Sequence, residues 1–267
     1  MNRKIKAIVA IFAVLLVFSM ASCTGGSSGG KSFNSAEDLK AYLDKQPVNT
    51  PDKPIKISMT INDPMIKNVA AVIKSAGKYV SLNITGNALT AIPDYAFHEC
   101  ISLTSVTIPD SVTIIDSYAF SGCTSLTSVT IPNSVTIIDS YAFSGCTSLA
   151  SVTIPHSVKG IGRAAFARCT GLTGITIPNS VISIVTMAFR ECTSLTGITI
   201  PNSVTSIEDW AFFGCTGLTS VTFEGTITSR DFDSDIPFPG DLRAKYLAGG
   251  IGTYTRPSGE SNTWTKQ

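Results

Sequence analysis

The sequence has no excess of charge of either sign. Among its 267 residues are 20 lysines and arginines and 19 aspartates and glutamates. Proteins that bind nucleic acids draw most of their sequence-independent affinity from basic side chains that neutralise phosphates. Because no basic excess is available for that purpose, the sequence argues against a nucleic-acid partner.

The sequence also lacks any group of residues with the spacing of a catalytic or metal site. It has two histidines, His98 and His156, which occupy different places in the repeat described below. Glu208 and Asp209 are adjacent carboxylates that are expected to be solvated. Without convergent nucleophiles, bases or metal ligands, the sequence predicts neither an enzyme nor a bound metal or cofactor.

A hydrophobic run stands near the start of the chain. Ala7–Phe18 is apolar but too short for a comfortable membrane span, and Arg3, Lys4 and Lys6 precede it. A basic start followed by a short apolar segment is typical of a secretory signal, which residues 1–22 are predicted to form. Its removal would leave 17 basic and 19 acidic residues, a net charge of about −2.

The residues that follow, Met20-Ala-Ser-Cys23, resemble a lipobox with methionine in place of the usual leucine, a relaxed form found in spirochaetes. The resemblance implies that Cys23 is lipidated and becomes the new N-terminus. Residues 23–34 would then be a flexible Gly/Ser-rich tether, and the protein would be anchored to the outer membrane, at the cell surface or in the periplasm. Ordinary cleavage near Ala21 or Ser22 is the alternative.

The dominant feature of the sequence is a short repeat that returns at constant spacing. Residues 103–125 and 126–148 are two successive copies, and they differ only at Asp110 and Asn133. A unit of this length cannot bury its apolar side alone, so successive units must stack and share one core. The repeat therefore predicts one elongated solenoid. Its period is marked by Cys100, Cys123, Cys146, Cys169, Cys192 and Cys215.

The cysteines could form disulfides or remain free thiols. An exported chain meets conditions in which disulfides form, but residues related by a translation along the stack have parallel Cβ directions, which disfavours bridges. We therefore predict a buried column of free thiols beside a column of phenylalanines. The predicted core positions are Cys123, Cys146, Cys169, Cys192 and Cys215 with Phe120, Phe143, Phe166, Phe189 and Phe212.

Within one repeat, two strands and a turn are expected. Residues 126–131 alternate between apolar and polar, which is the period of a strand with one buried face. Pro132 ends this strand because it has no N–H to donate, and residues 135–138 predict a second short strand. Residues 139–146 are expected to form one or two helical turns as their alanine and phenylalanine dock into the core.

The motif Leu-x-x-Val-x-Ile, then Pro-x-Ser-Val and Ala-Phe-x-x-Cys, resembles the Treponema-type, or BspA-like, leucine-rich repeat over about residues 80–223. The resemblance implies an α/β repeat solenoid with parallel strands and about six 23-residue coils, in a surface lipoprotein. Serine stands where ordinary leucine-rich repeats have asparagine, and these serines can bond to turn backbone. They are Ser111, Ser134, Ser157, Ser180 and Ser203.

Atypical segments are expected at both ends of the stack, where they would cover its core. Residues 35–79 predict a helical N-terminal cap with helices at Ser35–Leu43 and Pro64–Ala76, joined by an irregular or strand-like 47–63. Residues 224–267 predict a non-repeat C-terminal cap. It would hold a short helix at 241–247, a hairpin of 252–256 with 263–266, and the packed aromatic residues Tyr246, Tyr254 and Trp264.

A polar face is predicted on the strands. It is formed by Thr107, Thr130, Thr153, Thr176, Thr199 and Thr222 and flanked by Thr104, Thr127, Thr173, Thr196 and Thr219. Strand propensity on a solvated sheet explains such a face most simply. A carbohydrate- or ice-binding face is an alternative.

Specific binding is expected where the repeats differ, because aromatic residues and arginines are enriched at binding hot spots. The predicted partner-binding residues are Arg163, Arg168 and Arg190, with His156 and Lys159 nearby, and Trp210 and Phe213 in a later coil. The family resemblance implies an adhesin that binds a protein of the host matrix, such as fibronectin or fibrinogen, a host cell or another bacterium. A passive structural or decoy surface protein is the alternative, and a monomer is expected.

Overall fold

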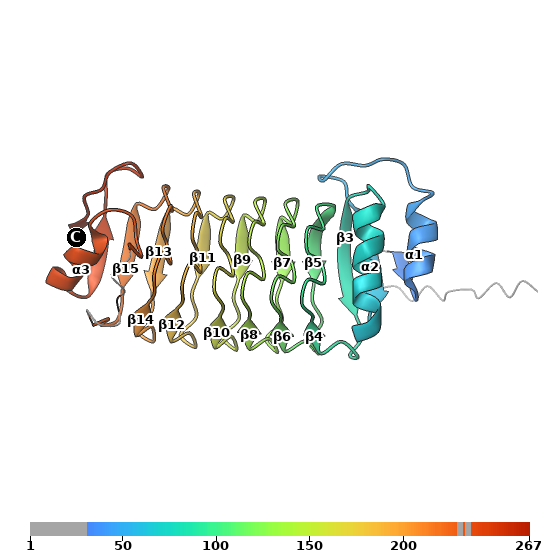
Figure 1. Ribbon diagram of the computed structural model, residues 1–267, viewed down its shortest axis with the longest axis horizontal. Coiled ribbons are helices and arrows are strands. Elements are labelled where there is room, and N and C mark those ends of the chain that lie inside the picture. The colour runs from blue at the N-terminus through green and yellow to red at the C-terminus, as the bar shows by residue number, and fades with distance from the viewer. Residues whose placement is uncertain (1–30, 229–231, 233–235) are drawn as a thin grey trace, which may run out of the picture.

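The structure is a computed structural model that describes residues 31–228, 232 and 236–267. It is an elongated ladder of coils with a cap at each end (Figure 1). The predicted signal segment and Cys23 lie outside the described residues. None of the helices in the described part has the length and apolarity to cross a membrane.

Parallel strands run along the whole ladder and confirm the predicted solenoid. The strands of neighbouring coils that pair do so at equivalent positions of the repeat, as Val106 with Val129 and Ile175 with Val152. The main strands are β3 (Val80–Thr85), β5 (Leu103–Thr107), β7 (Ser128–Thr130), β9 (Ser151–Thr153), β11 (Gly174–Thr176), β13 (Gly197–Ile200) and β15 (Ser220–Phe223). The second row is β4 (Ala91–Ile92), β6 (Ile114–Ile115), β8 (Ile137–Ile138), β10 (Gly160–Ile161), β12 (Ser183–Ile184) and β14 (Ser206–Ile207).

The core consists of columns of identical side chains, as the period predicts. The Phe143 and Phe166 rings are parallel with centroids 5.4 Å apart, and the stack runs from Phe97 to Phe238. All six cysteines of the column are buried and free. Each thiol from Cys123 onward donates to the carbonyl oxygen of the phenylalanine in the preceding coil, at 3.0–3.2 Å.

We expect these six thiols to resist alkylation in the folded protein. Burial raises the pKa of Cys100 and of Cys169 to about 12, so almost no reactive thiolate is present at neutral pH. Iodoacetamide at pH 8, followed by mass mapping, should modify them only after denaturant is added. Modification of Cys146 or Cys169 within minutes in native buffer would contradict a buried column.

The prediction of helical turns at residues 139–146 is wrong. The segment is a run of turns in which Ala142, Ser144 and Cys146 each donate to the residue three before. Tyr141 and Gly145 adopt left-handed φ values of 58° and 73°, which no α-helix contains. Their N–H groups instead donate to backbone carbonyls of the next coil. Hydrogen bonding between coils is therefore favoured over a local helix.

Polar ladders join the coils along the edges of the strands. The predicted serines donate to backbone carbonyls of the preceding coil, as Ser134 does to Val112 at 2.6 Å. The flanking threonines do the same, as Thr127 does to Thr104 at 3.0 Å. The serine ladder is therefore confirmed. The flanking threonine hydroxyls hold the stack together and are not free for a ligand.

The N-terminal cap contains strands as well as the two predicted helices. α1 (Ala36–Leu43) and α2 (Asp63–Ser75) begin after Ser35 and Asn62, whose side chains accept from Asp38 N and Met65 N. β2 (Ile55–Thr60) lies in the segment expected to be irregular or strand-like, and it pairs with β3. β1 (Lys31–Phe33) pairs with β2, so the predicted tether extends too far: its last residues form the edge of the main sheet.

The C-terminal cap contains the predicted helix and hairpin. α3 (Leu242–Gly249) precedes β16 (Gly252–Thr255), which pairs antiparallel with β15 and with β17 (Thr265–Lys266). Tyr246 packs on Phe223 with ring centroids 4.2 Å apart, and Trp264 donates from Nε1 to the Pro239 carbonyl at 2.9 Å. Tyr246, Tyr254 and Trp264 are all buried, which confirms their role in packing.

Candidate functional site

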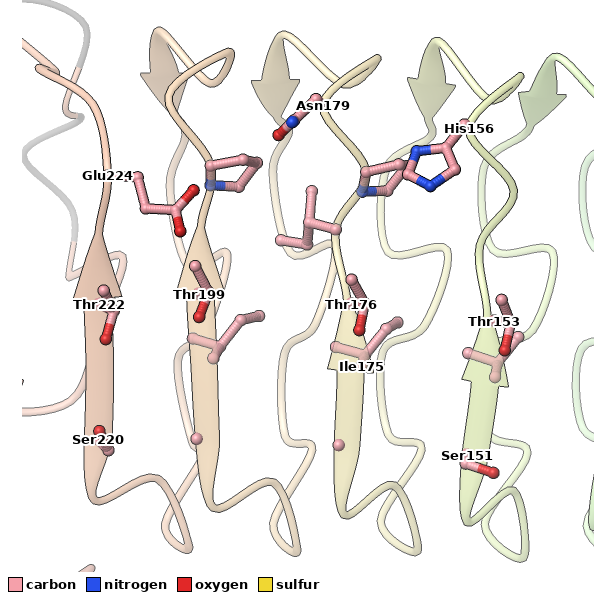
Figure 2. Close-up of a pocket in the computed structure, with 17 residues that line it drawn as sticks. Ser151, Thr153, His156, Ile175, Thr176, Asn179, Thr199, Ser220, Thr222 and Glu224 are labelled. Carbon is pink, nitrogen blue, oxygen red and sulfur yellow. The ribbon is translucent and has the colours of Figure 1, made fainter.

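A groove of about 850 Å³ lies on the outer face of β9, β11, β13 and β15 (Figure 2). Gly174 and Gly197 stand in it at the strand position that holds Ser151 in the preceding coil and Ser220 in the following one. A Cβ added to Gly174 would meet no atom within 4 Å. The missing side chains of two adjacent coils therefore open the groove.

The floor of the groove carries free hydroxyl groups. Figure 2 shows Thr153, Thr176, Thr199 and Thr222 in a row on successive strands. Thr222 bonds to Thr253 at 2.9 Å at the cap, whereas the other three hydroxyls have no hydrogen-bond partner in the described part of the chain. Among the described residues, five of the six central threonine hydroxyls of the predicted polar face are unbonded, and three of these five line the groove.

The groove has one ionisable side chain near each end. His156 follows β9 and Glu224 follows β15, and the two side chains lie toward opposite ends of the groove (Figure 2). Coils repeat at about 4.8 Å, so three steps separate these side chains by about 14 Å along the stack. Asn179 lies between them. The lining is otherwise uncharged, so the groove suits a mostly neutral ligand.

The repeat region also matches a described family. Residues 90–219 match the BspA type leucine rich repeat region in six copies. This part of the chain is a BspA-type leucine-rich repeat solenoid. The resemblance predicted from the repeated motif is therefore confirmed, and repeats of this family are generally non-enzymatic.

Solved structures of bacterial leucine-rich repeat proteins resemble this chain. The T. pallidum leucine-rich repeat protein is 29% identical; the match covers 69% of this chain and 80% of that one, with a TM-score of 0.52. A Bacteroides ovatus leucine-rich repeat protein is 26% identical over 60% of this chain and 48% of its own, with a TM-score of 0.41. A leucine-rich cell surface protein of Faecalibacterium prausnitzii is 22% identical over 74% of this chain and 78% of its own, with a TM-score of 0.36. No curated protein matches the chain.

Two of the predicted binding residues of the BspA-type solenoid, Arg168 and Arg190, lie together because both pair with one glutamate. Glu191 lies 3.0 Å from Arg168 Nε and 2.9 Å from an Arg190 nitrogen. Arg190 also lies over the ring of Phe213, 5.6 Å from its centroid, and Phe213 is 37% exposed. The cluster is less basic than the sequence indicated, because one carboxylate serves both arginines.

The other predicted binding residues are dispersed over the BspA-type coils. His156 lines the groove, whereas none of the three arginines does. Lys159 is exposed beside β10, and Arg163 is exposed in the turn segment. Trp210 is half-buried at a left-handed position of that segment, with a φ of 56°. The seven residues therefore do not form a single surface.

A stack of tyrosines on the turn segment is a feature that sequence reasoning missed. It consists of Tyr95, Tyr118 and Tyr141, with successive ring centroids 4.8 and 4.7 Å apart. Burial and the carboxylates of Asp94 and Asp139 raise the pKa of Asp116 beside the stack. The recurrence of tyrosine before Ala-Phe in the first three coils is the sequence pattern that indicates it.

Proposed function

We propose that this chain is an exported, lipid-anchored surface protein that binds a partner protein, in the manner of an adhesin, through the groove over β9, β11, β13 and β15. Its BspA-type repeats support an interaction or structural role at a surface. The observation that carries the proposal is the loss of two side chains at Gly174 and Gly197.

The groove suits an extended segment of polypeptide. The Thr153, Thr176 and Thr199 hydroxyls recur at the coil spacing and can bond to backbone groups of such a segment. The space above Gly174 and Gly197 accepts its side chains. The volume of the groove is of the size usual for ligand sites in proteins. A partner from the host matrix or from another bacterium fits this proposal.

The position of the groove along the solenoid supports presentation at a surface. The N-terminal cap lies at one end of the ladder, and β9 to β15 lie toward the other (Figure 1). Lipidation at Cys23 would attach the protein by the capped N-terminal end. The groove would then lie at a distance from the membrane along the ladder and be accessible to a partner.

Filling the groove is expected to abolish binding. The purified chain would be tested for saturable binding to a panel of matrix proteins and glycans, with Gly174→Trp and Gly197→Trp combined in one variant. Neither glycine has a positive φ, and an added Cβ meets no atom at Gly174 and only ordinary contacts at Gly197. We therefore expect an intact fold and at least a tenfold loss of affinity.

The matched control is Ser128→Trp, which puts the same side chain at the same strand position of β7, outside the groove. A second variant replaces Arg163, Arg168 and Arg190 together. Binding that survives filling of the groove but is lost in the arginine variant would move the site to the turn segment. Saturable glycan binding would favour a carbohydrate-binding face, and no binding across the panel would favour a structural role.

A further inference from the structure

The turn segments form a hydrogen-bonded ladder with a direction. In each coil, alternate N–H groups donate to carbonyl oxygens of the next coil. Tyr118 N donates to Ser140 O at 3.0 Å, and Phe120 N donates to Ala142 O at 2.8 Å. The first coil follows the same rule, with Tyr95 N donating to the coil after it. Every coil thus offers acceptors on the side that faces the N-terminus.

The first coil has no coil before it to use those acceptors. Its three carbonyls belong to Asp94, Ala96 and His98, and the cap places α2 in front of them. The Lys74 ammonium donates to the His98 carbonyl at 3.4 Å. The carbonyls of Asp94 and Ala96 receive no hydrogen bond from the described residues. A helix uses its own N–H groups internally, so α2 cannot replace the missing coil.

A cleft of about 310 Å³ lies at this open end of the ladder, between α2 and the first coil. Lys67, Ala71, Tyr95, Ala96 and His98 are among its lining residues. One face of the Tyr95 ring stacks on Tyr118, and Tyr95 is still 54% exposed, so its other face looks toward the cleft. The buried Nδ1 of His98 also has no partner among the described residues.

We propose that this cleft binds a short peptide of a partner protein that takes the place of a preceding coil. The peptide donates N–H groups to the carbonyl oxygens of Asp94 and Ala96, two residues apart, as one coil does to the next. An aromatic side chain of the peptide stacks on the free face of Tyr95, at the spacing that Tyr118 shows on the other face. This site is separate from the groove and does not depend on it.

The charges around the cleft select the kind of peptide. Lys67 and Lys74 border it, and Glu99 lies 3.5 Å from Lys74 and 3.8 Å from His98. Lys67 has no partner among the described residues, so the rim carries a net positive charge. A neutral or acidic peptide is therefore favoured over a lysine- or arginine-rich one.

The test uses the purified chain and the peptide acetyl-Ser-Tyr-Ala-Ser-amide, followed by backbone amide NMR. We expect saturable shifts confined to residues 67–74 and 94–98. Replacing the peptide tyrosine by alanine should weaken binding roughly threefold to tenfold, the worth of an aromatic contact. Methylating the tyrosine N–H should weaken it by a similar factor. Equal binding of the methylated peptide would overturn the proposed pairing.

Two variants of the protein complete the test. Ala71→Trp fills the cleft from an exposed position of α2, and Ala41→Trp places the same side chain on an exposed position of α1. Shifts that vanish in Ala71→Trp and persist in Ala41→Trp support the site. Shifts that persist in both variants, or their absence at millimolar peptide with the unaltered chain, would refute it.

Discussion

Replacing Phe166 by alanine is expected to lower the free energy of unfolding by about 3–5 kcal/mol, the usual cost of deleting a buried aromatic ring. Phe166 has no exposed surface, and its ring stacks between Phe143 at 5.4 Å and Phe189 at 5.7 Å. The substitution leaves a cavity in the middle of the column. Its neighbours are held in place by the ladders between coils and cannot close on it.

Chemical denaturation followed by circular dichroism measures the effect. Because each coil contacts only its neighbours, a cavity in the middle of the solenoid also weakens the coupling of its two halves. We expect a shallower transition as well as a lower midpoint. Ile182→Ala is the control in the next coil, since Ile182 is 60% exposed and should cost less than about 0.5 kcal/mol. A loss below about 1 kcal/mol for Phe166→Ala would be inconsistent with a packed column.

The solenoid was predictable because every coil imposes the same environment on the same position. Phe143 and Cys146 recur one repeat later as Phe166 and Cys169, and all four are buried. Residues that recur at a constant period can all be buried in the same way only if the structure repeats with the same period. The period therefore determined the strands, the core columns and the serine ladder before any contact was known.

The turn segment could not be predicted from local preference. Alanine and phenylalanine beside each other are compatible with a helical turn, but Tyr141 has a left-handed φ of 58°. A tyrosine adopts such a conformation only when surrounding structure compensates for it. Here the compensation is a set of hydrogen bonds to a neighbouring coil, such as Tyr141 N to Arg163 O at 2.8 Å. Such an interaction between coils has no signature within one repeat.

The strand β1 was not predicted, for a related reason. Lys31–Phe33 is three residues long and follows a Gly/Ser-rich stretch, so nothing in its composition separates it from a tether. It forms because β2 leaves an unpaired edge beside it, and Ser32 pairs with Ser58 there. An edge that accepts a strand is a property of the assembled sheet.

The groove was missed because it arises from a loss of side chains. Charged and aromatic residues that interrupt the repeat, such as Arg163, Arg190 and Trp210, are conspicuous in the sequence. Gly174 and Gly197 are the smallest changes in the repeat, yet they open space across four strands. In a solenoid of nearly identical coils, missing side chains distinguish one surface from another as clearly as added ones.

Replacing Arg256 by alanine is expected to destabilise the C-terminal end of the solenoid by about 3–5 kcal/mol, because several buried acceptors lose a charged donor together. Arg256 is only 4% exposed, although no acidic side chain in the described part of the chain pairs with it. Its guanidinium donates to the carbonyl oxygens of Leu218, Cys215, Thr216 and Ser261.

The same side chain joins the last coil to the cap. Arg256 follows β16, and its guanidinium lies over the ring of the buried Trp264, 5.1 Å from the centroid. Thr216 belongs to the last coil: the equivalent carbonyl one coil earlier, that of Thr193, accepts from Gly217 N at 2.9 Å, whereas no further coil in the described part of the chain donates to Thr216. The arginine therefore replaces the missing neighbour with one planar group that has five donors.

The planar shape of the guanidinium separates two explanations of its effect. Arg256→Lys keeps the positive charge but removes the fork of donors, so it should lose most of the same stability. A lysine variant as stable as the unaltered chain would show that charge alone matters. Hydrogen exchange should speed up in β15 to β17 of both variants and stay slow in β5 and β7, because the damage is at one end. Lys245→Ala is the control, since Lys245 is exposed and its pairing with Asp241 at 3.9 Å adds little.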